Sequence, residues 1–224
     1  MIFIKYLIRM IIINYSLIMK NQRELLSDED NPIIIRISTF GFSKEKKRTF
    51  IQYYMKGECN QEEIDSQFLS YEKTMKVEGE YIKITFTDSE NIEKYKQIPL
   101  TSFRKEDGVV FIYDVSDETT FNKLSDKLYY AGVSGNHDYL LIGDTSNMKN
   151  VDNLMKEIEN KTIGSFNCLA HYQINITDMN SVVTIMQNYV NYLITEKINV
   201  KLDCIFLNKY PNEENRRNKK KCVK

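Results

Sequence analysis

Four basic residues stand close together after the first strongly apolar strand pattern in this sequence. They are Lys44, Lys46, Lys47 and Arg48. The run before them, Ile33–Ser38, predicts a buried strand, and the segment after them predicts a helix that reaches about Met55. The start of a helix attracts anions, because the amides of its first turn lack partners inside the helix. Basic side chains at that position add their own positive charge. A basic run is also common on a solvated helix face, so both interpretations stay open.

Other groups that could support catalysis or bind a metal are scarce. The four cysteines, Cys59, Cys168, Cys204 and Cys222, are widely spaced and form no C-x-x-C pair. This spacing predicts neither a zinc site nor a disulfide framework, and it suits a reducing cytoplasm. In the sequence, no nucleophile stands out together with an activating base.

The size and charge of the chain limit the classes of protein it can be. Its 224 residues fit one large domain with a tail, since domains usually contain about 100–200 residues. The hydrophobic fraction of 42% is enough for one core. Basic and acidic residues number 31 each, so the overall charge gives no reason to expect a nucleic-acid partner.

The first 19 residues are apolar but are interrupted by Lys5, Arg9 and Asn14. Their longest uncharged run is about half of the ~20 residues that span a bilayer. Two interpretations stay open: a membrane segment, or an upstream extension with Met19 as the true start. We favour the second. The expected divisions are an N-terminal extension over 1–32, a core domain over 33–195 and a basic tail over 196–224.

From residue 33 onward, strand patterns alternate with amphipathic helix patterns. The predicted strands are Ile33–Ser38, Phe68–Val77, Tyr81–Thr87, Val109–Val115, Tyr139–Ile142 and Ser165–Leu169. The acidic-glycine pair Glu78-Gly79 predicts a tight hairpin, and therefore one antiparallel strand in a mostly parallel sheet. About five helices are expected, the last with an apolar stripe from Met179 to Leu193. Ligands of such α/β sheets bind at the carboxyl ends of the strands.

Four segments together resemble the small GTPases of the Rab and Ras type. The strongest match is Gly108–Leu124, which resembles their fourth strand and third helix. Counting back from it, Tyr81–Asp88 aligns without a gap with their third strand. Leu140–Asn147 aligns with the strand that precedes the guanine-reading motif and with that motif, and Asn175–Val183 resembles the entry to their last helix. The resemblance covers roughly residues 33–195. It implies a doubly wound P-loop small-GTPase fold, with GTP or GDP and Mg²⁺ as cofactors.

The resemblance places the phosphate loop G-x-x-x-x-G-K-[ST] on residues 41–48. Gly41 and Lys47 match the pattern, whereas Lys46 replaces the second glycine and Arg48 the metal-binding hydroxyl. Thr49 is one residue late for the metal. A long side chain at residue 46 would crowd the pyrophosphate. The candidate phosphate-binding residues are Gly41, Ser43, Lys44, Lys46, Lys47, Arg48 and Thr49.

The resemblance also assigns the metal-facing and catalytic positions. Asp88 begins the D-x-x-G motif and is the candidate Mg²⁺ ligand, although an aspartate at a strand end is also a common turn residue or helix cap. Asn91 replaces the glycine of that motif, and Ile92 replaces the glutamine that orients the attacking water. The first-switch threonine falls on Asp65, with Ser66 beside it. No catalytic residue is therefore assigned, and hydrolysis is expected to be very slow.

The guanine-binding positions have changed as well. Asn147 replaces the aspartate that accepts two hydrogen bonds from the base, and Asp144 and Thr145 replace the asparagine and lysine of the same motif. The final base-contacting loop is represented by Leu169-Ala170-His171, with Ala170 as the candidate contact. Losing the three contacts of residues 144, 145 and 147 should cost several kcal/mol, at roughly 1–3 kcal/mol each.

The C-terminal tail is basic. From residue 208 onward it contains seven basic and two acidic residues, a net charge of +5, and it ends Cys222-Val-Lys224. It resembles the tails of prenylated small GTPases, where a lipid and a basic patch bind anionic membranes. The ending is neither a C-a-a-X box nor a cysteine pair, so lipidation of Cys222 and a plain disordered tail both stay open.

These observations lead to two main hypotheses. In the first, the chain is a divergent Rab-like protein with weak or lost GTP binding and hydrolysis, which binds protein effectors through the switch-region surface in membrane traffic or signalling. In the second, it is a functional GTP-binding switch that regulates vesicle transport. A third option, an unrelated phosphate-binding enzyme, lacks the residues for its chemistry. Either main hypothesis predicts a cytoplasmic protein, with peripheral attachment to the cytosolic face of membranes as an option.

Overall fold

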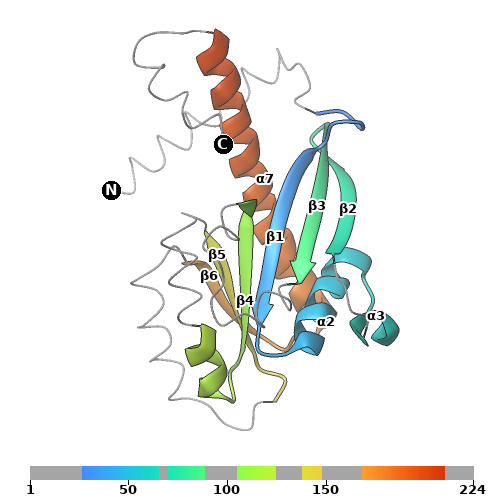
Figure 1. The fold of residues 1–224 in the computed structure, drawn as a ribbon, viewed down its shortest axis with the longest axis vertical. Helices are drawn as coiled ribbons and strands as arrows, with labels where there is room; N and C mark the ends of the chain where they lie inside the picture. Colours follow the sequence, from blue (N-terminus) through green and yellow to red (C-terminus); the bar gives the residue numbers. More distant parts are fainter. Residues whose placement is uncertain (1–26, 66–69, 89–104, 125–137, 148–167, 210–224) are drawn as a thin grey trace.

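A six-stranded sheet forms the centre of the molecule, with helices against it (Figure 1). The structure is a computed structural model that describes residues 27–65, 70–88, 105–124, 138–147 and 168–209. The strands are β1 (Ile33–Gly41), β2 (Ser70–Val77), β3 (Glu80–Asp88), β4 (Gly108–Asp114), β5 (Tyr139–Asp144) and β6 (Cys168–Ile174). The helices are α2 (Lys44–Lys56), α3 (Gln61–Asp65) and α7 (Met179–Lys209), and a further helical segment covers residues 118–124.

The strand order is β2-β3-β1-β4-β5-β6, in which only the β2/β3 pair is antiparallel. This confirms the predicted doubly wound fold with one antiparallel strand. The hairpin is confirmed too, because Val77 pairs with Glu80 and leaves the two residues Glu78 and Gly79 as the turn. Both have positive φ, 50° and 94°, as a two-residue hairpin of this twist requires.

The sheet has a hydrophobic cluster on each face. Because successive side chains of a strand point to opposite faces, Ile35 and Ile37 of β1 face α2 and α7, whereas Phe40 faces the helical segment 118–124. The central strands β4 and β5 are buried along their whole length. Their continuous apolar runs therefore follow from coverage on both faces.

Two boundaries differ from the sequence prediction. The last strand runs over Cys168–Ile174, not Ser165–Leu169, of which residues 165–167 lie outside the described part. It is an edge strand with partly exposed residues, so polar side chains continue it beyond the apolar run that marked it in the sequence. The predicted helix over Val151–Asn160 also lies outside the described residues.

The second difference concerns the start of α2. The basic residues were expected in a loop over Gly41–Arg48, yet β1 continues to Gly41 and α2 already begins at Lys44. Ser43 is the N-cap: its backbone is extended and its side-chain oxygen accepts a hydrogen bond from the Lys46 amide at 3.3 Å. This cap lets the helix start three residues before Lys47.

At both ends of the predicted core domain, 33–195, the described structure continues past the predicted bounds. Ser27, from the expected N-terminal extension, is buried and donates a hydrogen bond to Glu80 at 2.7 Å. At the other end α7 continues past residue 195 to Lys209 and projects beyond the sheet (Figure 1). Among the described helices, none is long and apolar enough to cross a membrane. Residues 1–18 lie outside this part.

Tyr189 of α7 anchors the helix to the sheet. Its hydroxyl accepts a hydrogen bond from the Val109 amide at 2.9 Å and donates to the Asp138 carbonyl at 2.9 Å. A side chain at Gly108 would meet this hydroxyl at 2.7 Å, so the close contact depends on glycine there. Burial raises the pKa of Tyr189 far above its ordinary value and keeps the hydroxyl protonated.

We expect Tyr189→Phe to lower the free energy of unfolding by about 1–3 kcal/mol, because the buried Val109 amide loses its acceptor. Urea unfolding followed by circular dichroism measures the change. Tyr53→Phe on α2, at a partly exposed tyrosine, is the matched control and should change stability by less than about 0.5 kcal/mol. Equal effects of the two substitutions would show that the Tyr189 hydroxyl has no anchoring role.

Candidate functional site

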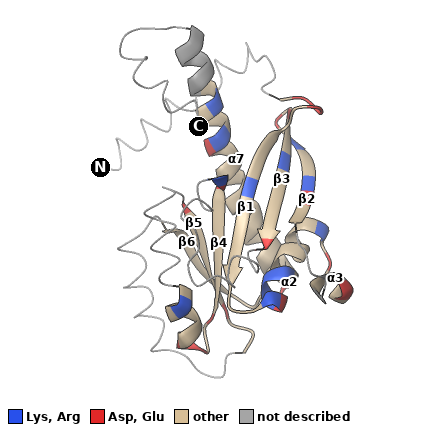
Figure 2. Cartoon of the chain, viewed as in Figure 1, with Lys and Arg blue, Asp and Glu red and all other residues tan. Residues whose placement is uncertain are grey.

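Three aspartates end three parallel strands at the carboxyl edge of the sheet, where β3 and β4 lie on either side of β1 and β5 follows β4. They are Asp88 of β3, Asp114 of β4 and Asp144 of β5, and all are buried. The start of α2, with its basic residues, lies against the same edge (Figure 2). This edge is where ligands of doubly wound sheets bind, so it is the candidate site.

Asp88 is the acid most deeply engaged with α2. Its Oδ1 lies 3.1 Å from Nζ of Lys47, and its Oδ2 lies 2.8 Å from Nε of Arg48. All three side chains are only 1% exposed. The Arg48 guanidinium also donates to the Ile64 carbonyl at the end of the following segment. Lys47 and Arg48 are therefore interior residues, and the interpretation of the basic run as a solvated face is wrong for both.

The stem of Lys47 passes directly over Gly41. A Cβ at residue 41 would lie 2.9 Å from Cγ of Lys47 and 3.1 Å from the Ile112 carbonyl. Glycine at this position therefore permits the close packing of the lysine against β1 and β4. Only Phe42 and Ser43 separate β1 from α2, so the chain between strand and helix is short.

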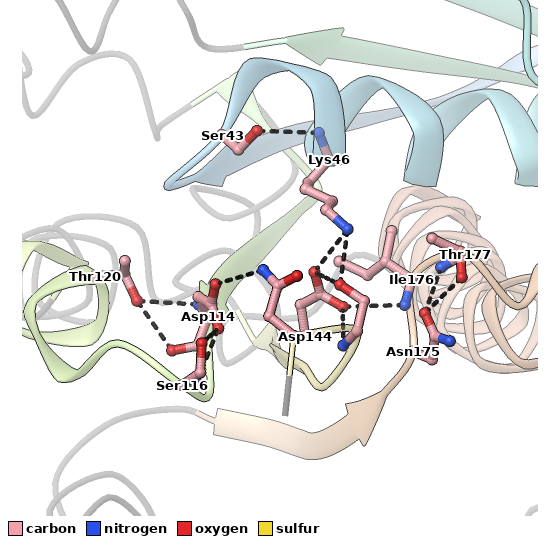
Figure 3. A network of polar contacts seen from close by, with 11 residues as sticks. Ser43, Lys46, Asp114, Ser116, Thr120, Asp144, Asn175, Ile176 and Thr177 are labelled. Carbon is pink, nitrogen blue, oxygen red and sulfur yellow. Dashed lines mark hydrogen bonds and ion pairs between the residues drawn. The ribbon is translucent and has the colours of Figure 1, made fainter. Parts of the chain in front are cut away.

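Lys46 reaches across the edge to the loop after β5. Its Nζ lies 3.3 Å from Oδ2 of Asp144 and donates to the Ser146 hydroxyl at 2.7 Å. Asp144 also accepts hydrogen bonds from the Ser146 amide at 3.0 Å and the Ile176 amide at 3.2 Å (Figure 3). Lys46 thus links α2 to the loop after β5, and Asp144 links that loop to the one after β6.

Asp114 is stabilised by neutral donors. Oδ1 accepts from the amide and hydroxyl of Ser116, at 2.8 and 2.6 Å, and Oδ2 accepts from the Asn147 side-chain amide at 3.1 Å (Figure 3). Burial raises the pKa of this carboxyl, but the hydrogen bonds from Ser116 and Asn147, together with the positive charge of Lys46, outweigh it. The pKa of Asp114 consequently lies below its ordinary value.

The structure distributes the other predicted site residues differently. Ser43 caps α2, and the Thr49 hydroxyl lies 3.6 Å from Sγ of Cys59. Ala170 was expected in the loop after the last strand, and this placement is wrong. It lies inside β6 opposite Leu140, because β6 continues to Ile174 and moves the loop to residues 175–178.

Several predicted positions fall outside the described residues. They are Ser66, Asn91, Ile92 and Cys222. Asp65 is the last residue of α3, and nothing is described of its side chain. Lys44 is the first residue of α2 and is partly buried.

Sequence reasoning missed three members of the site. Asp114, Ser146 and the Ile176 amide were not named as candidates, although each connects to a residue that was. An available signal was that β3, β4 and β5 all end in aspartate. His171, from the same predicted loop as Ala170, lies in β6, where its Nε2 is 2.9 Å from the Tyr113 hydroxyl.

The arrangement is one of mutual charge neutralisation. Lys46, Lys47 and Arg48 each contact a carboxylate of the sheet edge. Within the described ranges, no group of three or more His, Cys, Asp or Glu side chains is placed to hold a metal ion.

Comparison with known proteins gives a consistent result. The model of the Ras family matches residues 39–195, more than half of the chain. Ras-related protein Rab-11B of Dictyostelium discoideum is 23% identical over 163 residues, which cover 71% of this chain and 74% of that protein. Ras-related protein RABC2b of Arabidopsis thaliana is 31% identical over 107 residues, 44% of this chain and 50% of the relative. Ras-related protein RabH of Dictyostelium discoideum is 25% identical over 158 residues, which cover 67% of this chain and 75% of that protein.

We expect Asp88→Asn to lower the free energy of unfolding by about 3–5 kcal/mol, because it leaves Lys47 and Arg48 buried next to a neutral group. Chemical denaturation measures the loss. The control is Glu72→Gln, which removes the exposed pair with Lys83 at 2.7 Å and should cost less than about 1 kcal/mol. A loss for Asp88→Asn as small as that of the control would contradict this account of the buried cluster.

The lowered pKa of Asp114 predicts an acid-dependent contribution to stability. Its pKa is lower in the folded chain than the ordinary value of 3.8, so the carboxylate stabilises the fold above 3.8. That contribution is lost as the pH falls through the folded-state pKa. Urea unfolding of the wild type and Asp114→Asn at a series of acid pH values should show the stability difference shrinking below about pH 3.8. A difference independent of pH would refute the assignment.

Proposed function

This chain belongs to the Ras family, as a Rab-like small GTPase, and we propose that it is a protein-interaction module of membrane traffic or signalling whose GTP binding and hydrolysis are weak or lost. Members of the family generally bind GTP or GDP with Mg²⁺ and recognise protein effectors. We propose that this chain recognises protein effectors but has lost most of the nucleotide binding. The alternative is a working GTP-dependent switch, and it is favoured by Gly41, Lys47 and Asp88, which match the family's motifs. The experiment below distinguishes the two functions.

The burial of Lys47 and Arg48 against Asp88 is the observation on which the proposal rests. The resemblance gives Asp88 the role of facing a magnesium ion. Both of its carboxylate oxygens lie against protein cations instead, at 3.1 and 2.8 Å. A magnesium ion would compete with these cations for the same oxygens, and it prefers octahedral oxygen ligands with several waters. The residues present do not fit the metal, because Arg48 stands where a hydroxyl ligand belongs and its side chain is 1% exposed.

The start of α2 supports the same proposal for the phosphates. A phosphate loop binds through backbone amides that have no other partner. Here the Lys46 amide donates to Oγ of Ser43 at 3.3 Å, and the Lys47 amide donates to the Ser43 carbonyl at 3.1 Å. The amides of Lys46 and Lys47, which the resemblance assigns to phosphate binding, thus already donate hydrogen bonds to Ser43.

The region expected to read guanine is also engaged internally. The Asn147 side-chain amide donates to Asp114, and Asp144 faces Lys46 and Ser146. An asparagine offers one acceptor where an aspartate offers two, so even a released Asn147 would pair poorly with the guanine edge. Binding of guanine nucleotide is therefore expected to be weak at phosphate, metal and base together.

Attachment to membranes is part of the proposal and rests on the sequence alone. The basic tail beyond residue 208, with a net charge of +5, suits an anionic lipid surface on the cytosolic face. Cys222, in the same tail, is a candidate site for a lipid. Apart from Lys209, which ends α7, the tail lies outside the described residues.

Thermal unfolding of the full chain, alone and with GTP or GDP plus Mg²⁺, tests the proposal. A ligand present at 100 times its Kd adds about 2.7 kcal/mol to the stability of the fold that binds it. We expect no shift at ligand concentrations that saturate working small GTPases. A clear rise with guanine nucleotides and none with adenine nucleotides would reject the proposal in favour of the GTP-dependent switch.

A restored variant serves as the positive control for this measurement. Lys46→Gly, Arg48→Ser and Asn147→Asp together return the three family side chains, and we expect GTP to stabilise that variant more than the wild type. If GTP affinity does not rise, the placement of these motifs on the sequence is wrong.

A further inference from the structure

We propose that Arg48 replaces a metal ion as the link between β3 and the connection from α2 to β2, and thereby holds residues 57–64 in one conformation that no nucleotide controls. The inference rests on the proposed function and specifies how the site is regulated. In the resemblance, the first switch falls at the end of this connection, at residues 65 and 66. A segment there that responds to nucleotide needs contacts that come and go with the ligand.

Arg48 joins two structures that are distant in sequence. Its Nε lies 2.8 Å from Oδ2 of Asp88 at the end of β3, 40 residues away. A second nitrogen of the same guanidinium donates to the Ile64 carbonyl in α3. A guanidinium can serve both because it is a rigid, permanently charged fork with several donors. By the resemblance, a magnesium ion would link Asp88 to the switch segment only while nucleotide is bound, whereas Arg48 is covalently part of α2.

Gln52, one helical turn after Arg48, makes a second link. The Asn60 amide donates to Oε1 of Gln52 at 2.6 Å, and Nε2 of Gln52 contacts the Asn60 carbonyl at 3.4 Å and the Tyr71 hydroxyl at 3.0 Å. The Gln52 residue is fully buried. It therefore fixes the main chain of the connection to α2 and, through Tyr71, to the start of β2.

The connection is also ordered by its own contacts. It begins at Gly57, which ends α2 with φ at 75° and donates to the Tyr53 carbonyl at 3.1 Å. Asn60 then caps α3, since its side chain accepts from the Glu62 amide at 2.9 Å and its carbonyl from the Ile64 amide at 3.2 Å. Ile64 is buried. Every one of these contacts is made between groups of the protein itself.

The consequence for regulation follows from linkage. A ligand changes a conformational equilibrium only as far as it binds one conformation better than the other. The links through Arg48 and Gln52 already stabilise one conformation of residues 57–64. Nucleotide binding can then change the populations of the conformations only slightly. Any partner that recognises residues 57–64 would then bind the chain equally well with and without GTP.

Hydrogen exchange of the full chain, read by mass spectrometry over residues 58–64, tests the inference. In Arg48→Lys the charge beside Asp88 remains but the fork to Ile64 is lost, and we expect exchange in this segment to accelerate about tenfold or more. Glu45→Gln, at an exposed position of the same helix, is the matched control and should leave the segment unchanged. Adding GTP or GDP with Mg²⁺ should not slow exchange in the wild type.

A second variant covers the case in which Arg48→Lys does not fold. Gln52→Met keeps the Arg48 pair and the side-chain volume but removes the hydrogen bonds to Asn60, and it should accelerate the same segment. The inference is overturned if a folded variant at 48 or 52 exchanges like the wild type, or if nucleotide slows exchange of residues 58–64 in the wild type.

The two proposals fail separately in these measurements. Nucleotide that raises the unfolding temperature but leaves exchange of residues 58–64 unchanged rejects the proposed function and supports the inference. No thermal shift, together with Arg48→Lys exchanging like the wild type, rejects the inference alone.

Discussion

The buried carboxylate of Asp88 between Lys47 and Arg48 is the contact on which the arrangement of this edge of the sheet depends. Charged groups that are 1% exposed must be compensated within the protein, since each loses several kcal/mol of hydration on burial. This requirement fixes the start of α2 against the end of β3. It also explains why Gly41 is needed beneath the stem of Lys47.

The same requirement is met by different means along the edge. Asp144 is satisfied by Lys46 and by hydroxyl and amide donors, and Asp114 by the neutral groups of Ser116 and Asn147. The three strand-end acids are therefore joined to α2 and to the loops after β4, β5 and β6. The exposed pair of Lys83 and Glu72, at 34% and 53% exposure, shows the contrast, because water can replace either partner there.

The match to the family and the candidate site lie in different parts of this protein. The match to the Ras family spans residues 39–195, and the identities of 23–31% with Rab-named relatives accompany a fold with the expected sheet order. The segment that resembles the family most, Gly108–Leu124, contains the fully buried strand β4 and the helical segment 118–124. A core of this kind preserves a fold, whereas activity depends on a few side chains at its edge. At that edge, Lys46, Arg48 and Asn147 each contact a strand-end aspartate.

The sequence by itself determined the alternation of strands and helices, the Glu78-Gly79 hairpin and the family, because these depend on local periodicity, turn chemistry and spacing along the chain. It also predicted that Lys46, Arg48 and Asn147 stand at replaced positions of the family's motifs. Only the tertiary structure decided where their charges go, since the pairing of Arg48 with Asp88 joins residues 40 positions apart through the packing of α2 on the sheet. The position of β6 was likewise decided by pairing with β5, because an edge strand needs hydrogen bonds more than an apolar pattern.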